Sequence, residues 1–390
     1  MTINYSVHIA GDPHLERGIY RAAVYNKNKV ELVFLKNGEP IKTVSLSAGQ
    51  RSIFATLQCT KDKIALFCNR LGIDEQQLEY DCSPLPIAEK MVYKVLWLKR
   101  KLVEAFVPVQ WVIVYKKQGD SAWRKIIPDS KVFQADSFII FENNKYYVFY
   151  EELKFKDDHG YLMVAELDVE NACLRNQKVI LHKKFHLSYP CVFKEENTYY
   201  MIPESGDANS IDLYECTQFP FEWKKKKTLV ADIQAVDTTP LKTEKGWYLF
   251  TTEIVKGAPC NDELFIYKSD DLFEKPFEKL YDMPVVSDVS NARMAGSFFR
   301  KNGDILRVAQ DCGKRYGHKV NINKVIQIEG GYKEELIETI EPDFLMAGFH
   351  TYNQSKDIII GDMEIIRLDF YSLKRYTWRN LKRVFGFNKN

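Results

Sequence analysis

The sequence of 390 residues lacks the features that mark several large classes of protein. Its eight cysteines include no Cys-x-x-Cys pair, so neither a zinc ribbon nor a dense disulfide framework is indicated. No stretch approaches the ~20 uninterrupted apolar residues of a membrane span, and the first residues show no basic segment followed by an apolar one. We therefore expect a cytoplasmic protein with reduced thiols.

Charge of one sign is also scarce. The 55 basic and 53 acidic residues leave a formal net charge of +2, so we expect no nucleic-acid partner and look for charge in local patches. A P-loop, a dinucleotide fingerprint, an HExxH motif and a nucleophile elbow are all missing. We expect no cofactor and no metal, because a lone histidine such as His350 is more often a hydrogen-bonded core residue than a ligand.

The sequence is rich in aromatic residues, and they occur in a repeated pattern. The stretch QADSFIIFENNKYYVFYEE (134–152) has counterparts in LSYPCVFKEENTYYMIPES (187–205) and AVDTTPLKTEKGWYLFTTE (235–253), with weaker copies at 293–311 and 348–364. Each copy reads as a strand, a short polar turn and a second strand, and the copies recur at about fifty residues. Two more strand-like pieces follow most copies, which is typical of a β-propeller blade.

This count predicts a mainly β protein with a five-bladed β-propeller. The fifth copy lacks its outer strands, and 111–117 with 121–127 would supply them and close the ring. A β-sandwich with chance similarity is the alternative. The predicted divisions are a small α+β region (1–83), a basic amphipathic helix or linker (84–107), the propeller (108–365) and a basic amphipathic C-terminal tail (366–390). Within the first region, 3–9, 19–25 and 30–47 read as strands and 52–73 as a helix.

The innermost strands of a propeller line one central channel, so equivalent residues of the copies should meet there. The aligned positions are Asp136, Tyr189, Asp237, Ala295 and Gly348, with Arg293 and His350 nearby. Paired carboxylates can protonate a glycosidic oxygen and activate a hydroxyl or water, and arginine or histidine can bind the sugar. The alternative is that each Asp caps a turn at a solvated rim.

A second layer comes from the end of the second strand of each hairpin. Glu151, Glu204 and Gln310 share one register and Glu152, Glu253 and Asp311 share the next, and only one set can face inward because neighbouring strand residues face opposite sides. We expect catalytic roles for Asp136, Asp237 and Glu204. Substrate-binding roles are expected for Tyr189, Glu151, Arg293, Gln310, Asp311, Arg315 and His350.

The repeated segments, together with AVDTTP, SDVSNARMAGSFFR, RVAQDCGKRYG and HTYN, resemble a known propeller domain. It is the one found at the N-terminal side of plant glucosamine inositolphosphorylceramide transferases and in stand-alone bacterial relatives. More distantly, the segments are similar to five-bladed glycoside hydrolases of the arabinanase and β-xylosidase type. That resemblance implies a general base at Asp136, while Tyr189 and Asp237 stand where those hydrolases carry an Asp and a Glu.

Three functions remain open at this point. The first is a glycosyltransferase-like enzyme of surface polysaccharide or glycolipid biosynthesis, acting on a sugar or nucleotide sugar. The second is an intracellular glycoside hydrolase, and the third is a non-catalytic glycan-binding or scaffold propeller serving a partner transferase. The basic-apolar segments 89–106 and 369–390 favour a peripheral position at the inner membrane face, with an anionic membrane surface or a lipid-linked acceptor as partner. The alternative is that both helices pack on the propeller with their basic residues solvated.

Overall fold

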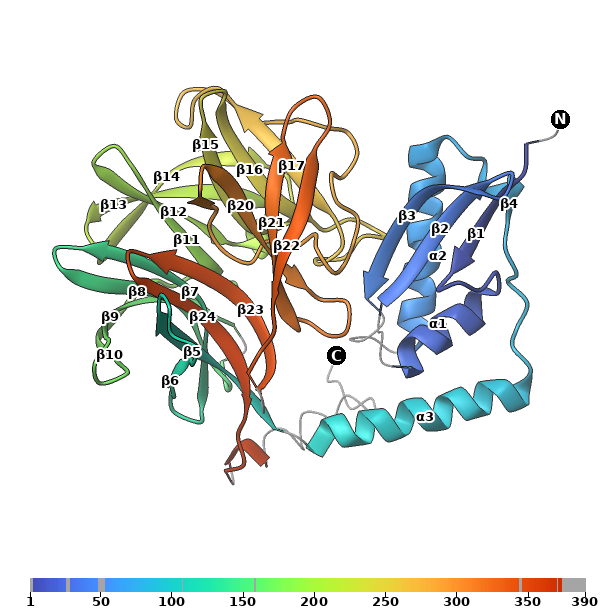
Figure 1. The fold of residues 1–390 in the computed structure, drawn as a ribbon, viewed down its shortest axis with the longest axis horizontal. Coiled ribbons are helices and arrows are strands. Elements are labelled where there is room, and N and C mark those ends of the chain that lie inside the picture. Colours follow the sequence, from blue (N-terminus) through green and yellow to red (C-terminus); the bar gives the residue numbers. More distant parts are fainter. Residues whose placement is uncertain are drawn as a thin grey trace.

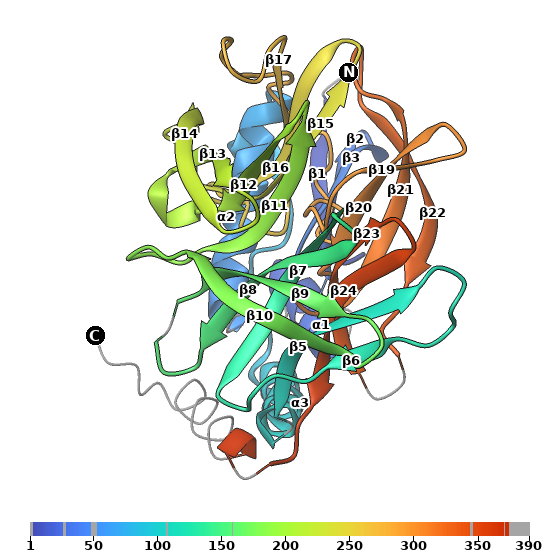
Figure 2. The same ribbon diagram turned by 90° about the vertical axis from the view of Figure 1, so that its left-hand side faces the viewer.

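The computed structural model describes residues 3–25, 29–47, 53–106, 108–157, 159–343, 346–369 and 371–373, with the backbone alone for 100–106. Within this part of the chain, the strands form six four-stranded sheets. One sheet lies in an N-terminal unit, and the other five follow one another through 109–366 and are arranged like the blades of a propeller (Figure 1 and Figure 2). The protein is therefore mainly β, as the sequence predicts.

The N-terminal unit is a sheet with two helices on it. The strand order β3-β2-β1-β4 puts β1 at the centre, antiparallel to β2 and parallel to β4. The helices α1 and α2 cover the sheet, and their apolar side chains join one core with the strands. The elements are β1 (Tyr5–Ile9), α1 (Leu15–Val24), β2 (Lys29–Lys36), β3 (Glu39–Ser47), α2 (Ile53–Leu71), the 3-10 turn η1 (Glu75–Gln77) and β4 (Leu78–Glu79).

The prediction of a strand at 19–25 is wrong, because these residues belong to α1. His14 caps this helix by accepting a hydrogen bond from the Arg17 amide, and buried residues recur at Leu15, Ile19 and Ala22. That spacing matches a helix rather than the alternation of a strand.

A single long helix, α3 (Ile87–Phe106), links the N-terminal unit to the rest of the chain and runs along the base of that unit (Figure 1). The helix predicted at 89–106 is thus present. None of the described helices is both long and apolar enough to cross a membrane. The predicted basic helix of the C-terminal tail lies almost wholly outside the described residues, which end at 373.

The five remaining sheets are built mainly from hairpins that follow one another along the chain. The first consists of β7 (Val132–Glu142), β8 (Lys145–Lys154), β9 (Tyr161–Asp168) and β10 (Cys173–Leu181). The second has β11 (Ser188–Glu195), β12 (Thr198–Glu204), β13 (Ser210–Gln218) and β14 (Glu222–Ala231), with the turn η2 (Gly206–Ala208). The third has β15 (Ala235–Thr243), β16 (Gly246–Glu253), β17 (Leu264–Ser269) and β18 (Glu278–Lys279). The fourth has β19 (Phe299–Lys301), β20 (Asp304–Asp311), β21 (Lys319–Gln327) and β22 (Lys333–Ile340).

The last sheet joins the two ends of this region. It contains β23 (Met346–Ser355), β24 (Ile358–Ile366), β5 (Val109–Lys117) and β6 (Arg124–Ile126), in that order. β24 pairs antiparallel with β5 from Ile358 opposite Lys117 to Ile366 opposite Val109. The predicted supply of outer strands by residues 111–117 and 121–127 is therefore present, and it satisfies the edge that the final hairpin would otherwise expose.

Candidate active site

A bulge near the start of the first strand turns one side chain of each of three sheets toward the common centre. In β7, β11 and β15 the pairing register shifts at Asp136, Tyr189 and Asp237, whose φ angles are 53°, 45° and 50°. Left-handed φ is uncommon outside glycine, and such strain concentrates at functional sites. In the last sheet the corresponding shift falls between Phe349 and Thr351, so His350 rather than the aligned Gly348 takes this place.

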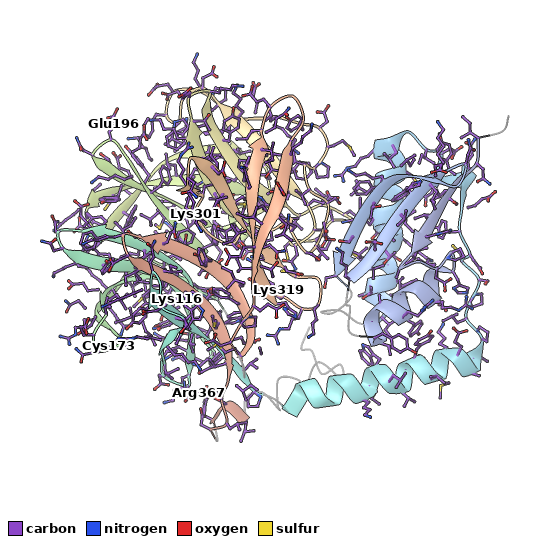
Figure 3. All side chains as sticks on the ribbon, in the orientation of Figure 1. Lys116, Cys173, Glu196, Lys301, Lys319 and Arg367 are labelled. Carbon is purple, nitrogen blue, oxygen red and sulfur yellow. The ribbon has the colours of Figure 1, made fainter. Side chains whose placement is uncertain are left out.

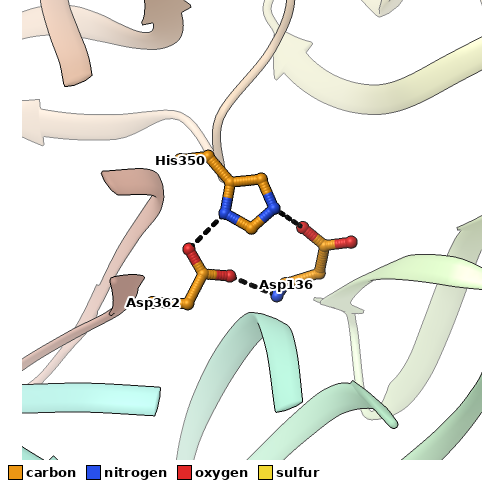
Figure 4. Close-up of side chains that lie close together, drawn as sticks. All are labelled: Asp136, His350 and Asp362. Carbon is orange, nitrogen blue, oxygen red and sulfur yellow. Dashed lines mark hydrogen bonds and ion pairs between the residues drawn. The ribbon is translucent and has the colours of Figure 1, made fainter. Parts of the chain in front are cut away.

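His350 lies between two buried carboxylates (Figure 4). Its Nε2 atom is 3.3 Å from Asp136 Oδ1, and its Nδ1 atom is 2.5 Å from Asp362 Oδ1. Asp362 also accepts hydrogen bonds from the backbone N–H groups of Asp136 and Thr351. Burial disfavours the charged ring, but Asp362 and Asp136 outweigh it and raise the pKa of His350, which favours a proton on both nitrogens.

These three residues also meet the distance requirement for holding a cation, since one ligand atom of each lies within 4.8 Å of the others. Both ring nitrogens of His350 already face carboxylate oxygens. A metal ligand needs a neutral imidazole nitrogen. The arrangement therefore fits a shared proton better than a metal ion.

A second group, next to the first, centres on the buried guanidinium of Arg293. Its Nε donates to Asp237 Oδ2 at 2.5 Å, and its terminal nitrogens donate to Glu204 Oε2 at 3.2 Å and to Asn261 Oδ1 at 3.1 Å. The Gln310 amide donates to the same Asp237 oxygen at 3.0 Å. Arg293 thus fixes two carboxylates that come from different sheets.

The enclosure changes the protonation of three acids. Burial raises the pKa of Asp136 to about 7, with His350 opposing the shift and Asp237 and Asp362 adding to it. Burial, followed by the charge of Asp237, raises the pKa of Glu204 well above its usual value, against the effect of Arg293. The centre therefore holds two carboxyls whose pKa values are raised, Glu204 and Asp136, and Asp136 titrates near neutral pH.

Glu151 is the third carboxyl whose pKa is raised. Burial and then the charge of Asp136 raise its pKa, and its Oε1 atom has no hydrogen-bond partner among the residues that the structure describes. His186 Nε2 lies 3.4 Å from that oxygen, while Nδ1 accepts the Gly160 N–H at 2.9 Å. Because Nδ1 is an acceptor, the neutral ring carries its proton on Nε2.

Of the other predicted residues, Tyr189 packs in the core next to the cluster, whereas Asp311 and Arg315 lie away from the cluster. Tyr189 is fully buried and is part of the core, with its N–H on Asp136 Oδ2 at 3.2 Å and its hydroxyl on Thr239. Asp311 faces away from the cluster, where it accepts the Gly313 N–H at 2.8 Å. Arg315 is partly exposed and forms an ion pair with Glu364.

Two residues of the centre are not among those predicted from the sequence. Asp362 lies in the second strand of the last hairpin, whereas the residues predicted from that hairpin all lie in its first strand. Its signal is a carboxylate next to Gly361 in the apolar run IIIGDMEII. Asn261 lies in the loop that follows β16, outside the repeated segment, and no pattern marks it.

The loop of Asn261 is held by the N-terminal unit. Lys63 of α2 is fully buried, with its Nζ 3.1 Å from Asp262 Oδ2 and 3.8 Å from Glu263 Oε1. Arg70 donates to both Glu263 oxygens at 2.8 and 3.0 Å. The N-terminal unit thus anchors residues that directly follow one of the partners of Arg293.

Fold and site together define a propeller-like protein whose centre holds four buried carboxylates, the partly buried Glu204, an arginine and a histidine. The family described as "Glucosamine inositolphosphorylceramide transferase 1, N-terminal" matches residues 92–353, and the chain belongs to this family. Among curated relatives, "Glucosamine inositolphosphorylceramide transferase 1" of Oryza sativa subsp. japonica is 32% identical over 206 residues, 52% of this chain and 27% of that protein. The Arabidopsis thaliana protein of the same name is 30% identical over 220 residues, 55% of this chain and 28% of that protein. The chain thus matches little more than a quarter of the length of these relatives.

Solved structures with a similar fold include glycoside hydrolases. A family 117 glycoside hydrolase of Zobellia galactanivorans gives a TM-score of 0.44 at 13% identity, covering 68% of this chain and 93% of that one. A GH43 endo-arabinanase of Bacillus licheniformis gives 0.43 at 14% identity, covering 61% of this chain and 96% of that one.

Proposed function

We propose that this chain is a carbohydrate-active enzyme whose reaction takes place at the central cluster, with the five sheets as the blades of one closed ring. The reaction we favour is transfer of a glycosyl group from a sugar donor, such as a nucleotide sugar, in surface polysaccharide or glycolipid assembly. Family membership supports this choice, because the relatives are named as transferases. An acceptor linked to a lipid would bring the chain to a membrane surface.

The observation that carries the proposal is the presence of two carboxyls with raised pKa values in one cluster. The pKa of Asp136, raised to about 7, suits a general base that takes the proton of an acceptor hydroxyl. Glu204, whose pKa burial raises well above its usual value, suits a general acid that protonates the oxygen of the leaving group. Asp237, fixed by Arg293 and Gln310, supplies negative charge where an oxocarbenium-like centre would form.

Hydrolysis is the second candidate. The same acid and base would serve if water replaced the acceptor hydroxyl, and the raised pKa of Glu204 is what protonation of a glycosidic oxygen requires. A third candidate, binding without catalysis, is favoured by the near-complete enclosure of Asp237, whose side chain is 2% exposed.

Product analysis separates the three candidates. The purified chain is incubated with a panel of nucleotide sugars plus lipid-linked and saccharide acceptors, and separately with aryl glycosides. Transfer predicts a larger acceptor, hydrolysis predicts a free sugar, and binding alone predicts thermal stabilisation by a sugar without turnover.

Variants then test the assigned roles. We expect Asp136→Asn and Glu204→Gln each to lower the rate by about 100-fold or more, because each removes one proton-transfer group. Asp311→Asn is the matched control, since Asp311 directly follows Gln310 in β20 but faces away from the cluster. Equal activity in all three variants would contradict the assignment.

A further inference from the structure

The helix α3 turns its apolar side outward. Described side chains that point away from the N-terminal unit are largely exposed and apolar, with exposed fractions of 83% for Ile87, 57% for Met91, 58% for Val92 and 61% for Val95. The buried side of the helix carries Tyr93, which stacks on Tyr20 at 5.2 Å. A helix on the surface of a soluble unit normally shows the opposite pattern.

Basic residues accompany this apolar face. The helix has five basic and two acidic residues in its sequence. Of these, Lys94 and Lys99 are exposed. Lys90 is tied to Glu16 at 3.1 Å, whereas no ion pair involving Lys94 is found among the described residues. An apolar face flanked by lysines is the composition of a helix that lies in the interface of an anionic membrane.

A cavity of about 480 Å³ opens beside the same helix, between α3, α1 and α2. Its wall is mostly apolar, and Lys94 is among its lining residues. Phe54, at the start of α2, also lines it and is 77% exposed. The exposed apolar surface thus extends from α3 onto the neighbouring helix.

The end of the described chain lies near the C-terminal end of α3. The Arg367 N–H donates to the carbonyl of Pro108, which follows α3 closely, and Figure 3 shows Arg367 at the end of the propeller nearest this helix. Leu368 is 73% exposed. The sequence of 374–390 contains six basic and no acidic residues.

We propose that the outer face of α3, with Phe54, docks on a membrane surface that contains anionic lipid. The charges favour this occupant over two others. A second copy would bring together two basic helices, and the C-terminal residues are themselves basic, so both would meet a like charge. Anionic lipid offers apolar depth for Met91, Val92 and Val95 and negative head groups for Lys94 and Lys99. This docking does not depend on the catalytic role of the central cluster.

Vesicle flotation tests the proposal. The full chain is mixed with vesicles of phosphatidylcholine alone or with added phosphatidylglycerol, and we expect binding to rise at least about tenfold with the anionic lipid and to weaken in high salt. Val92→Asp/Val95→Asp should lower binding roughly tenfold or more, because two valines lose their apolar contact. Leu336→Asp/Ile337→Asp is the matched control, since these residues of β22 are 55% and 48% exposed and lie outside α3.

A charge variant and a truncation complete the test. Lys94→Gln/Lys99→Gln should reduce anionic binding by roughly fivefold per lysine without changing thermal unfolding, which keeps the proposal testable if the aspartate variant does not fold. Failure of the full chain to bind anionic vesicles would overturn the proposal. A dimer that dissociates in Val92→Asp/Val95→Asp would also overturn it, because a second copy would then cover the helix. Stronger vesicle binding after removal of 374–390 would overturn it too, because the C-terminal residues would then cover the helix.

Discussion

The charges of the central cluster do not balance. Its carboxylates are Asp136, Glu151, Glu204, Asp237 and Asp362, and its cations are Arg293 and His350. An excess of buried acid is unfavourable for folding, because each ionised group without a partner loses its hydration. A protein keeps such an arrangement where function requires it, and substitutions there can stabilise the fold while removing activity.

Glu151→Gln should show this directly. Burial raises the pKa of Glu151 above its ordinary value of 4.5, so the native state binds this proton more tightly than the unfolded state does. The resulting stability is complete below the ordinary pKa and is lost as the pH rises through the native pKa. The variant should therefore gain in unfolding free energy relative to wild type between about pH 5 and about pH 8, by roughly 1 kcal/mol or more. Chemical denaturation at both pH values measures this difference.

Glu152→Gln is the control for that experiment. Glu152 is the next residue of β8 and faces the other side, where it accepts hydrogen bonds from Tyr161 at 2.6 Å and from Gln134 at 2.9 Å. Its substitution should give no gain that grows with pH. A pH-independent difference for Glu151→Gln would show that this carboxyl is not held protonated.

Arg293→Met should have the opposite effect on stability. The change leaves the buried Asp237 without its cation and removes a hydrogen-bond donor from the partly buried Glu204, which together cost roughly 3–5 kcal/mol of unfolding free energy. Arg300→Met provides the comparison, because Arg300 in β19 is exposed and should change stability by less than about 0.5 kcal/mol. Urea unfolding of the two variants decides the point, and a loss below about 1 kcal/mol for Arg293→Met would mean that the two acids are not held by this charge.

The alignment of copies predicted part of this cluster and missed another part for a physical reason. Asp136, Tyr189 and Asp237 occupy equivalent bulges, so one register found all three. Asp362 projects from the neighbouring strand of its sheet, and its partner His350 is only twelve residues away in sequence. Which of two neighbouring strands supplies a central carboxylate is decided by the local shift of register, which the repeat does not encode.

At the scale of the elements, the feature that the repeated hairpins share is a β-bulge in the first strand. An extra residue in one strand bends it and re-aims the side chain at that point. The sequence contained the strands, the turns and the closing pair β5 and β24, because alternation and turn residues are local signals. The conformation of α1 was missed since its short apolar segment is compatible with a strand until the cap at His14 is considered.

Replacing Asp237 with glycine and with alanine tests the strain of this bulge. Both changes remove the carboxylate, so the loss of Arg293 and Gln310 contacts cancels in the comparison. The φ angle of 50° suits glycine, and the glycine variant should be more stable by roughly 1 kcal/mol. At Tyr248 of β16, which pairs with Leu241 and Lys268 away from the register shift, the order should reverse, because glycine weakens a strand. The same order at both positions, in thermal unfolding, would argue against strain at Asp237.

At the scale of the whole molecule, the N-terminal unit and the propeller-like region share one buried ionic network. Lys63 and Asp262 are 199 residues apart in sequence, and both side chains are fully buried. Gly257 lets the propeller loop approach α2, since a Cβ atom there would lie 2.6 Å from the Asp62 carbonyl oxygen. No pattern within either region predicts such contacts, and for this reason the sequence assigned the N-terminal unit no role.

Lys63→Met should uncouple the two regions. Asp262 would be left buried without its cation, at a cost of roughly 3–5 kcal/mol, whereas Lys61→Met on the exposed side of α2 should cost less than about 0.5 kcal/mol. In calorimetry, we expect the variant to unfold in two transitions where the wild type unfolds in one. Adding Asp262→Asn should restore part of the stability, because it removes the orphaned charge. Since Asn261 precedes Asp262 and holds Arg293, the single variant should also weaken sugar binding at the cluster. One unchanged transition in Lys63→Met would show that this ion pair does not couple the unfolding of the two regions.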